Sequence, residues 1–189
     1  MTSPVIEEVF SLYEKYGAQD YIGEPVSQLE HMSQAAQLAI QNRQDDEVVL
    51  AAFFHDIGHL CASEAAASMN GFGVVQHEKI GADYLRKQGF PERVARLVEN
   101  HVQAKRYLTF KYPAYYNSLS DASRQTLDFQ GGVMSAAEAD QFEKDPLFEA
   151  SIMLRKWDEL AKEIGQPCMD LETLKRIAER VLQTNANVA

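Results

Sequence analysis

The sequence has few of the residues that mark disulfide-stabilised, membrane-spanning or nucleic-acid-binding proteins. Its 189 residues include only 2 cysteines, and Cys61 and Cys168 lie too far apart for a CxxC zinc or redox motif. No apolar run approaches the ~20 residues of a membrane span, and the opening MTSPVIEEVF has acids where a signal peptide has Lys or Arg. We therefore expect a cytoplasmic protein with both thiols reduced.

Positive charge is also scarce. Lys and Arg number 18 against 28 Asp and Glu, which gives a formal net charge of -10. This balance disfavours general binding to nucleic acid or to an anionic membrane. A small anionic ligand would need a local basic pocket.

Sheet-like patterning is missing as well, since no stretch alternates polar and apolar residues long enough to indicate a strand. Helix start and stop signals recur along the whole chain, without repeats or a linker. We predict an all-α fold in which residues 1–189 form a single domain. A chain of this size buries roughly 70% of its unfolded surface, so any metal would serve chemistry rather than stability.

Capping residues and apolar periodicity predict where the helices lie. Pro4 opens the first helix, and Pro25 is expected in the first turn of the second. Asp45 is expected to cap a third helix, whose apolar run 48–54 indicates a central, fully buried segment. After a loop over 61–73, further helices are expected over 75–87, from Pro91 to about Tyr107, from Ser120 to before Gly131, from the Ser135–Glu138 capping box, from Asp145-Pro146 to about Ile164, and from Asp170.

All 5 histidines lie on expected helices or at their ends, at His31, His55, His59, His77 and His101. Asp56 follows the buried run, where an unpaired carboxylate would cost several kcal/mol unless a cation or several donors met it. A single His on an apolar helix face is more often a core residue than a ligand, but several of them with a buried Asp indicate a metal site. Imidazole and carboxylate ligands without a thiolate suit iron, manganese or zinc, and Asp56 could bridge two ions with one oxygen for each.

The order of these residues resembles the HD-domain superfamily over most of the chain. The resemblance rests on His31, His55-Asp56, His77, His101 and Asp158. It implies a helical bundle around a dinuclear site, with His31, His55, Asp56 and Asp158 on one metal and Asp56, His77 and His101 on the other. From its own context Asp158 could equally be a solvated acid, because it lies in the charge-rich stretch 156–159.

Five short motifs narrow the resemblance, namely YIGE at 21–24, HDIGH at 55–59, QHEK at 76–79, HVQAKRY at 101–107 and SDASR at 120–124. Together they resemble the mixed-valent di-iron oxygenases that cleave the C–P bond of 1-hydroxyphosphonates. The resemblance implies two iron ions, active as Fe(II)/Fe(III), and O2 as co-substrate. It also implies a small anionic substrate with a primary amine or a trimethylammonium group, cleaved to phosphate and glycine or glycine betaine.

Four further residues could bind the phosphonate. Lys105 shares a helix face with the ligand four residues before it, Arg155 precedes the late Asp by three residues, and His59 lies one turn after the first residue of the His-Asp pair. With the Ser123 hydroxyl these groups could clamp an anion, and the resemblance implies the same role. Alternatively, Lys105 and Arg155 are exposed helix cations and Ser123 is a helix-turn residue.

Tyr21 and Glu24 precede the first expected ligand. The resemblance implies that Tyr21 occupies the oxygen-binding position of the first iron until substrate arrives, and that Glu24 contacts the substrate's ammonium end and helps to move the tyrosine away. Both could also be ordinary loop residues before a helix.

Two other functions stay open. A phosphomonoesterase or phosphodiesterase of the same superfamily could use the same ligands to activate water. A non-catalytic HD module that senses a metal or ligand is the third possibility, although all six ligand positions are filled here.

Overall fold

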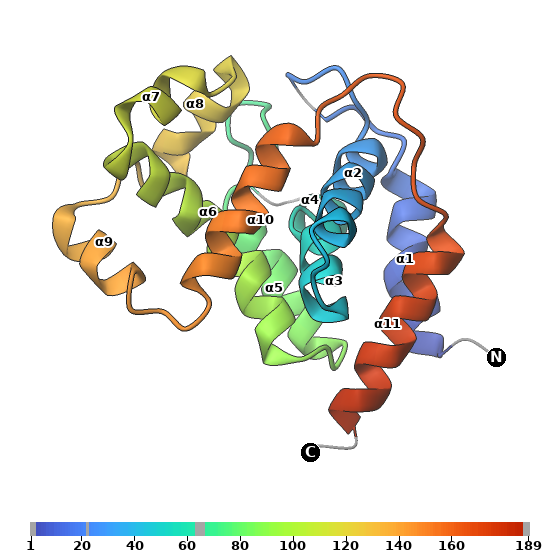
Figure 1. Cartoon of the computed structure of the whole chain (residues 1–189). Coiled ribbons are helices and arrows are strands. Elements are labelled where there is room, and N and C mark those ends of the chain that lie inside the picture. The colour runs from blue at the N-terminus through green and yellow to red at the C-terminus, as the bar shows by residue number, and fades with distance from the viewer. Residues whose placement is uncertain (1–2, 22, 63–66, 187–189) are drawn as a thin grey trace.

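The computed structural model describes residues 3–21, 23–62 and 67–186; Ile22 of the first motif lies outside them. The described residues form eleven helices and no strand, which confirms the all-α prediction (Figure 1). The helices are α1 (Pro4–Tyr16), α2 (Gln28–Gln41), α3 (Asp46–Phe54), α4 (Gly58–Cys61), α5 (His77–Lys87), α6 (Glu92–Lys111), α7 (Pro113–Ser118), α8 (Asp121–Phe129), α9 (Ala136–Phe142), α10 (Phe148–Leu160) and α11 (Leu171–Ala186). In this part of the chain no helix is long and apolar enough to cross a membrane.

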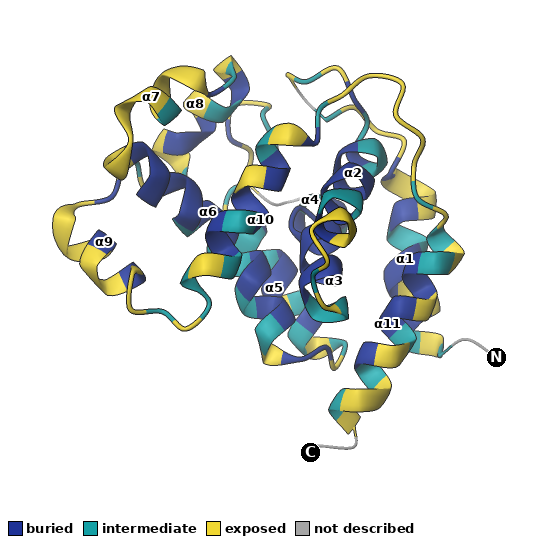
Figure 2. Cartoon of the chain, in the orientation of Figure 1, coloured by how far each residue is buried: buried dark blue, intermediate teal, exposed yellow. Residues whose placement is uncertain are grey.

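Helix α3 lies at the centre, as its apolar run predicts. Every residue of 48–54 is buried, and α3 packs against α2, α6, α10 and α11. Figure 2 shows the buried residues gathered where these helices meet, with exposed residues over much of α7 and α9. A second, smaller apolar cluster joins the C-terminal half of α6 to α9 and the start of α10.

Several expected caps are present. The Asp45 carboxylate accepts the Val48 N–H at 3.1 Å, Ser120 caps α8, and Ser135 with Glu138 forms the expected capping box of α9. Each side chain satisfies an N–H that the first helical turn leaves without a backbone partner. These short polar signals therefore locate the helix starts well.

The prediction that Pro25 lies in the first turn of the second helix is wrong. Helix α2 begins at Gln28, because Ser27 and Glu30 form a capping box: the Ser27 hydroxyl accepts the Glu30 N–H at 3.2 Å, and the Glu30 carboxylate accepts the Ser27 N–H at 2.7 Å. Pro25 lies in the turn before it. A bridge joins Asp20 to Ser27 just before the helix.

Other boundaries differ by a turn or less. Helix α5 starts at His77 rather than residue 75, because Gln76 adopts a left-handed φ of 59°. Helix α6 runs on to Lys111 and stops where Pro113 forces Tyr112 into an extended conformation. Helix α10 is shorter than expected at both ends, and the short helices α4 and α7 were not predicted. Helix α4 includes Cys61, where the loop over 61–73 was expected to begin, and residues 63–66 of that loop lie outside the described residues.

Candidate dinuclear metal and anion site

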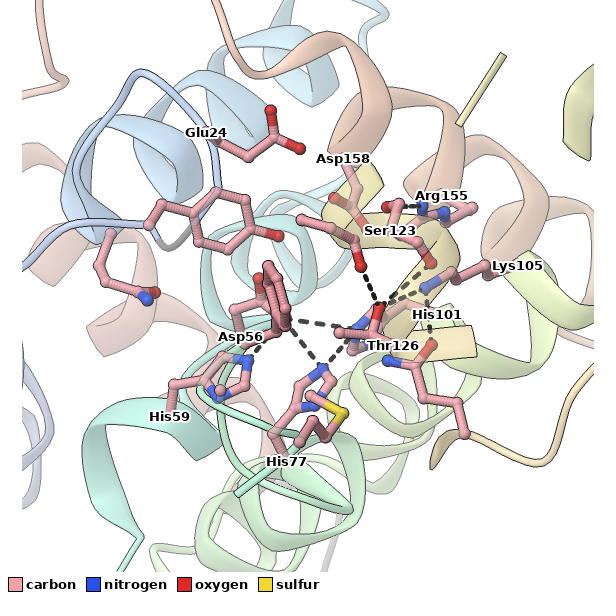
Figure 3. Close-up of a pocket in the computed structure, with 17 residues that line it drawn as sticks. Glu24, Asp56, His59, His77, His101, Lys105, Ser123, Thr126, Arg155 and Asp158 are labelled. Atoms are coloured by element: carbon pink, nitrogen blue, oxygen red, sulfur yellow. Dashed lines mark hydrogen bonds and ion pairs between the residues drawn. The ribbon is translucent and has the colours of Figure 1, made fainter. Parts of the chain in front are cut away.

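One pocket gathers most of the residues singled out in the sequence, and Figure 3 shows those that it labels converging from several helices. Ten of the twelve line the pocket, namely Tyr21, Glu24, Asp56, His59, His77, His101, Lys105, Ser123, Arg155 and Asp158. The other two, His31 and His55, are fully buried beside Asp56. The cavity encloses about 60 Å³, which suits a small ligand.

Four histidines form two facing pairs. Nε2 of His31 lies 3.0 Å from Nε2 of His55, and Nε2 of His77 lies 3.1 Å from Nε2 of His101. Each pair comes from two helical segments far apart in the sequence: α2 with the end of α3, and α5 with α6. The packing of these helices thus creates two places where the Nε2 atoms of two imidazoles face each other.

The backbone fixes which nitrogen of each ring faces inward. The Nδ1 atoms contact carbonyl oxygens, with His31 on Ala161 O at 2.9 Å, His55 on Ala52 O at 2.8 Å, His77 on Val74 O at 3.3 Å and His101 on Val98 O at 2.6 Å. A carbonyl only accepts, so each Nδ1 carries the proton and each neutral ring presents an Nε2 lone pair. Two lone pairs about 3 Å apart repel unless a proton or a metal ion lies between them.

Asp56 lies between the two pairs and offers one oxygen to each. Its Oδ2 is 3.3 Å from His55 Nε2, and its Oδ1 is 3.2 Å from His77 Nε2. Oδ2 is buried without a hydrogen-bond partner among the described residues, which is costly for a carboxylate unless a cation meets it. Two groups of three residues are close enough to hold a metal: His31, His55 and Asp56, and Asp56, His77 and His101.

Asp158 belongs to the same centre, so its interpretation as a solvated surface acid is wrong. It is 2% exposed, and its Oδ1 lies 3.3 Å from His31 Nε2. Its other oxygen forms a short ion pair with Arg155, one turn earlier on α10. Burial raises the pKa of Asp158, but the Arg155 charge and the histidines outweigh burial and hold the pKa well below its ordinary value.

The donor set fits two metal ions. Two nitrogens that bind one ion at ~2.1 Å lie roughly 3 Å apart. The observed separations of 3.0 and 3.1 Å are of that size, so each histidine pair could bind one metal ion. Burial lowers the pKa of His55, but the Asp56 and Asp158 carboxylates outweigh burial and raise this pKa to about 9. The two carboxylates therefore favour a positive charge, such as a metal cation, at this position.

His59 has the opposite tautomer from the four paired histidines. Its Nδ1 accepts the Val74 backbone N–H at 3.1 Å, so in the neutral ring Nε2 carries the proton. Burial, and to a lesser degree the neighbouring His77, lower the pKa of His59 to about 3, which keeps the His59 ring neutral. His59, stacked on His77 at 4.1 Å, can therefore donate a hydrogen bond into the pocket.

Lys105 and Arg155 are buried, at 2% and 4% exposure, so their interpretation as exposed helix cations is wrong. The Lys105 ammonium donates to Thr126 Oγ1 at 2.9 Å and to Gln130 Oε1 at 2.8 Å, and no carboxylate of the described ranges lies within ion-pair distance of it. Burial, together with the Arg155 charge, lowers its pKa well below the ordinary value. An anion in the pocket would relieve this cost.

Arg155 and Ser123 extend the cationic side of the pocket (Figure 3). Arg155 is ion-paired with Asp158 and Glu159, and its Nη2 donates to the Ser123 hydroxyl at 3.3 Å. Burial disfavours the Arg155 charge, but the Asp158 carboxylate raises its pKa above the ordinary value. Ser123 lies in the first turn of α8, and the Ser120 cap accepts its N–H.

Tyr21 and Glu24 lie at the pocket, on the segment before α2. The Tyr21 ring stacks on His31 with centroids 4.0 Å apart. Burial and the carboxylates of Asp56 and Asp158 raise the pKa of Tyr21 well above its ordinary value, so in the absence of a metal cation it is a phenol. The Glu24 carboxylate accepts hydrogen bonds from the Ser120 hydroxyl at 2.6 Å and from the Lys162 ammonium at 2.8 Å.

Sequence reasoning missed the residues that support this pocket. Thr126 and Gln130, the partners of Lys105, lie one turn apart at the end of α8, and Gln28 presents a buried Oε1 without a partner in the described part of the chain. The spacing of Thr126 and Gln130 with Ser123 on one helix face was the available signal. Lys162 follows α10 and had no signal in the sequence.

Comparisons with known proteins agree with this geometry. Residues 28–180 match the HD domain family. The chain is 40% identical over 178 residues to [1-hydroxy-2-(trimethylamino)ethyl]phosphonate dioxygenase (glycine-betaine-forming) of Leisingera caerulea, covering 94% of this chain and 90% of the relative. It is 37% identical over 180 residues to hydroxymethylphosphonate dioxygenase of Gimesia maris, covering 94% and 88%. An uncharacterized protein of Acanthamoeba polyphaga mimivirus is 42% identical over 183 residues, covering 96% and 84%. The resemblance drawn from the short motifs is confirmed.

Proposed function

Because the chain belongs to the HD domain family and aligns along almost its whole length with two phosphonate dioxygenases, we propose that it cleaves the C–P bond of a 1-hydroxyphosphonate with O2. The proposed substrate carries an amine or a trimethylammonium group on carbon 2, and the products are phosphate and glycine or glycine betaine. The reaction consumes one O2 and releases one proton. Carbon 1 gains one oxygen to become a carboxylate, and phosphorus gains one as its bond to carbon breaks.

The proposed cofactor is a pair of iron ions. His31, His55, Asp56 and Asp158 would hold one ion, and Asp56, His77 and His101 would hold the other. Imidazole and carboxylate ligands without a thiolate suit iron, and the separations within the histidine pairs are short enough for one ion to bind both rings of a pair. When bound, the pair supplies the redox chemistry that O2 activation requires.

The protein's own residues bind and orient the phosphonate. Lys105 has three N–H groups, of which two are used by Thr126 and Gln130, and the third donates to a phosphonate oxygen. His59 donates through Nε2, while Ser123 and Arg155 complete the set. Charge-assisted contacts of this kind fix both the position and the orientation of an anion.

At the other end of the substrate, Glu24 faces the ammonium group. Tyr21 packs on His31 beside the first metal position and covers it while no substrate is present. Substrate binding moves Tyr21 away. Because Tyr21 covers the metal position until then, oxidation of the metals in the absence of substrate is limited. Both roles are part of the proposal.

The main support for this proposal is that two buried groups line the same 60 Å³ cavity. One is Lys105, which has no carboxylate partner among the described residues, and the other is Asp56, whose carboxylate faces two histidine pairs. Such a cavity combines a metal centre with a place for one small anion. A superfamily phosphohydrolase would share both features. Its attacking water needs an open metal position, whereas here Tyr21 packs against the first histidine pair.

The experiment is an assay of the iron-loaded protein with 1-hydroxyphosphonates bearing a primary or a trimethylated amine. Phosphate release is measured in air and under strict anaerobiosis, with a phosphomonoester of similar size as the comparison substrate. We expect phosphate from the 1-hydroxyphosphonate only when O2 is present. Equal release without O2, or preferred cleavage of the ester, would identify a hydrolase instead.

A further inference from the structure

Glu24 does not present a free negative charge to the pocket. Its Oε1 lies 2.8 Å from Lys162 Nζ and also accepts the Ser120 hydroxyl. The side chains of Lys162 and Glu24 are only 16% and 10% exposed, so solvent screens this ion pair weakly. Any cationic group that approaches Glu24 meets a carboxylate whose charge is already compensated.

The backbone next to Lys162 contacts a histidine of the first pair. Lys162 follows Ala161, whose carbonyl oxygen contacts His31 Nδ1 at 2.9 Å. The next residue, Glu163, is held to α2, because its carbonyl and N–H both bond the Gln34 side chain. The backbone on either side of Lys162 is therefore anchored to the helix that carries the first ligand.

Lys162 also ends a series of alternating charges that begins on α10 and continues just past the end of that helix. It lies 3.7 Å from Glu159, which pairs with Arg155, which in turn pairs with Asp158 at the metal centre. No group in this series is left as an isolated buried charge. The Glu24–Lys162 pair is thus complete before any substrate enters.

We propose that Lys162 determines how the site discriminates substrates by charge. Lys162 supplies the countercharge of Glu24, so a 1-hydroxyphosphonate without a cationic substituent, such as hydroxymethylphosphonate, binds without leaving an uncompensated buried carboxylate. A substrate ammonium gains less from Glu24, because it must share the carboxylate with Lys162. The site accordingly accepts uncharged as well as cationic substituents on carbon 1. This inference rests on the proposed function.

The test compares kcat/KM for hydroxymethylphosphonate and for [1-hydroxy-2-(trimethylamino)ethyl]phosphonate, measured by phosphate release. The variants are Lys162→Met, which removes the charge, Lys162→Gln, which keeps a donor for Glu24, and Lys162→Arg, which keeps the charge. Lys156→Met is the matched control, because Lys156 is an exposed lysine on α10. Iron content and Tm are measured for each variant.

We expect the wild-type protein to cleave both substrates. Lys162→Met and Lys162→Gln should shift the kcat/KM ratio at least tenfold toward the trimethylammonium substrate, mainly through KM. Lys162→Arg and Lys156→Met should keep the wild-type ratio. A lysine that only holds Glu24 in place would instead lower both activities together.

Two results would overturn the inference while leaving the proposed function intact. One is a wild-type protein that cleaves only the trimethylammonium substrate, and the other is an unchanged ratio in whichever of Lys162→Met and Lys162→Gln retains iron. Release of phosphate from neither substrate by the wild-type protein would refute the proposed function itself, and this inference with it.

Discussion

Replacing Lys105 with methionine should weaken substrate binding and yet not destabilise the protein. Methionine has a similar length and no charge, and the side chain it replaces is 2% exposed. The variant loses the ammonium contact to the phosphonate. Losing one member of a buried, hydrogen-bonded charge pair costs ~2 to 5 kcal/mol, which corresponds to a rise of roughly 30-fold to several thousandfold in the apparent Kd.

The free energy of unfolding of the substrate-free Lys105→Met protein should rise or stay the same. Burial lowers the pKa of Lys105, so the folded state pays to keep the ammonium charged, and methionine removes this cost. Thr126 keeps its bond to the Ala122 carbonyl at 3.0 Å, and only Gln130 Oε1 loses its contact. We expect a Tm equal to or above that of the wild type.

The pH dependence of stability should also differ between the wild type and Lys105→Met. Because the folded pKa of Lys105 is depressed, the unfolded chain binds more protons between that value and ~10.4. Wild-type stability should therefore gain from this residue as the pH rises through that window, and Lys105→Met should lack the gain.

The assays are calorimetric titration of the iron-loaded protein with substrate under anaerobic conditions, and thermal unfolding as a function of pH. Lys111→Met is the control, since Lys111 lies on the same helix, is 46% exposed and pairs with Glu143. It should leave substrate affinity unchanged. An unchanged affinity in Lys105→Met, or a loss of stability as large as the loss in binding, would refute the assignment of Lys105 to the anion.

Three further predictions concern the metal centre and the pocket wall. Asp56→Asn should abolish activity and most iron binding, because a neutral amide cannot bridge two cations; two irons per chain in this variant would contradict the bridge. Tyr21→Phe should remove a phenolate-to-iron absorption band from the oxidised, substrate-free protein and speed its reaction with O2, and an unchanged spectrum with unchanged oxygen sensitivity would mean that Tyr21 only packs. Gly73→Ala should lower substrate affinity while keeping iron, because a Cβ there would lie 2.6 Å from His59 Cε1 at a φ of +111°; wild-type affinity would argue against a role for His59 orientation.

The fold and much of the site could be predicted because their signals are local. The buried run of α3, the caps at Asp45 and Ser120, and the capping box at Ser135 each act within one turn, so the sequence displays them directly. Burial of Lys105 could not be read from helical spacing, because it depends on α8 folding back over α6 to bring Thr126 to its ammonium.

Contacts between distant segments were the part that could not be predicted. The Glu24–Lys162 pair joins residues 138 positions apart, and no local pattern indicates such a partner. The tautomer of His59 likewise depends on a backbone N–H from the loop before α5. Both features depend on where loops lie after the helices have packed.

The central claim is that O2 supplies the oxygen that replaces the broken C–P bond, and the most direct measurement is isotope incorporation. The iron-loaded protein is given a 1-hydroxyphosphonate under 18O2 in ordinary water, and both products are analysed by mass spectrometry. We expect one 18O atom in phosphate and one in the carboxylate, because phosphorus and carbon 1 each gain one oxygen atom and the balanced reaction takes both from O2. Phosphate that contains only solvent oxygen would show that water attacks phosphorus and would contradict the oxygenase assignment.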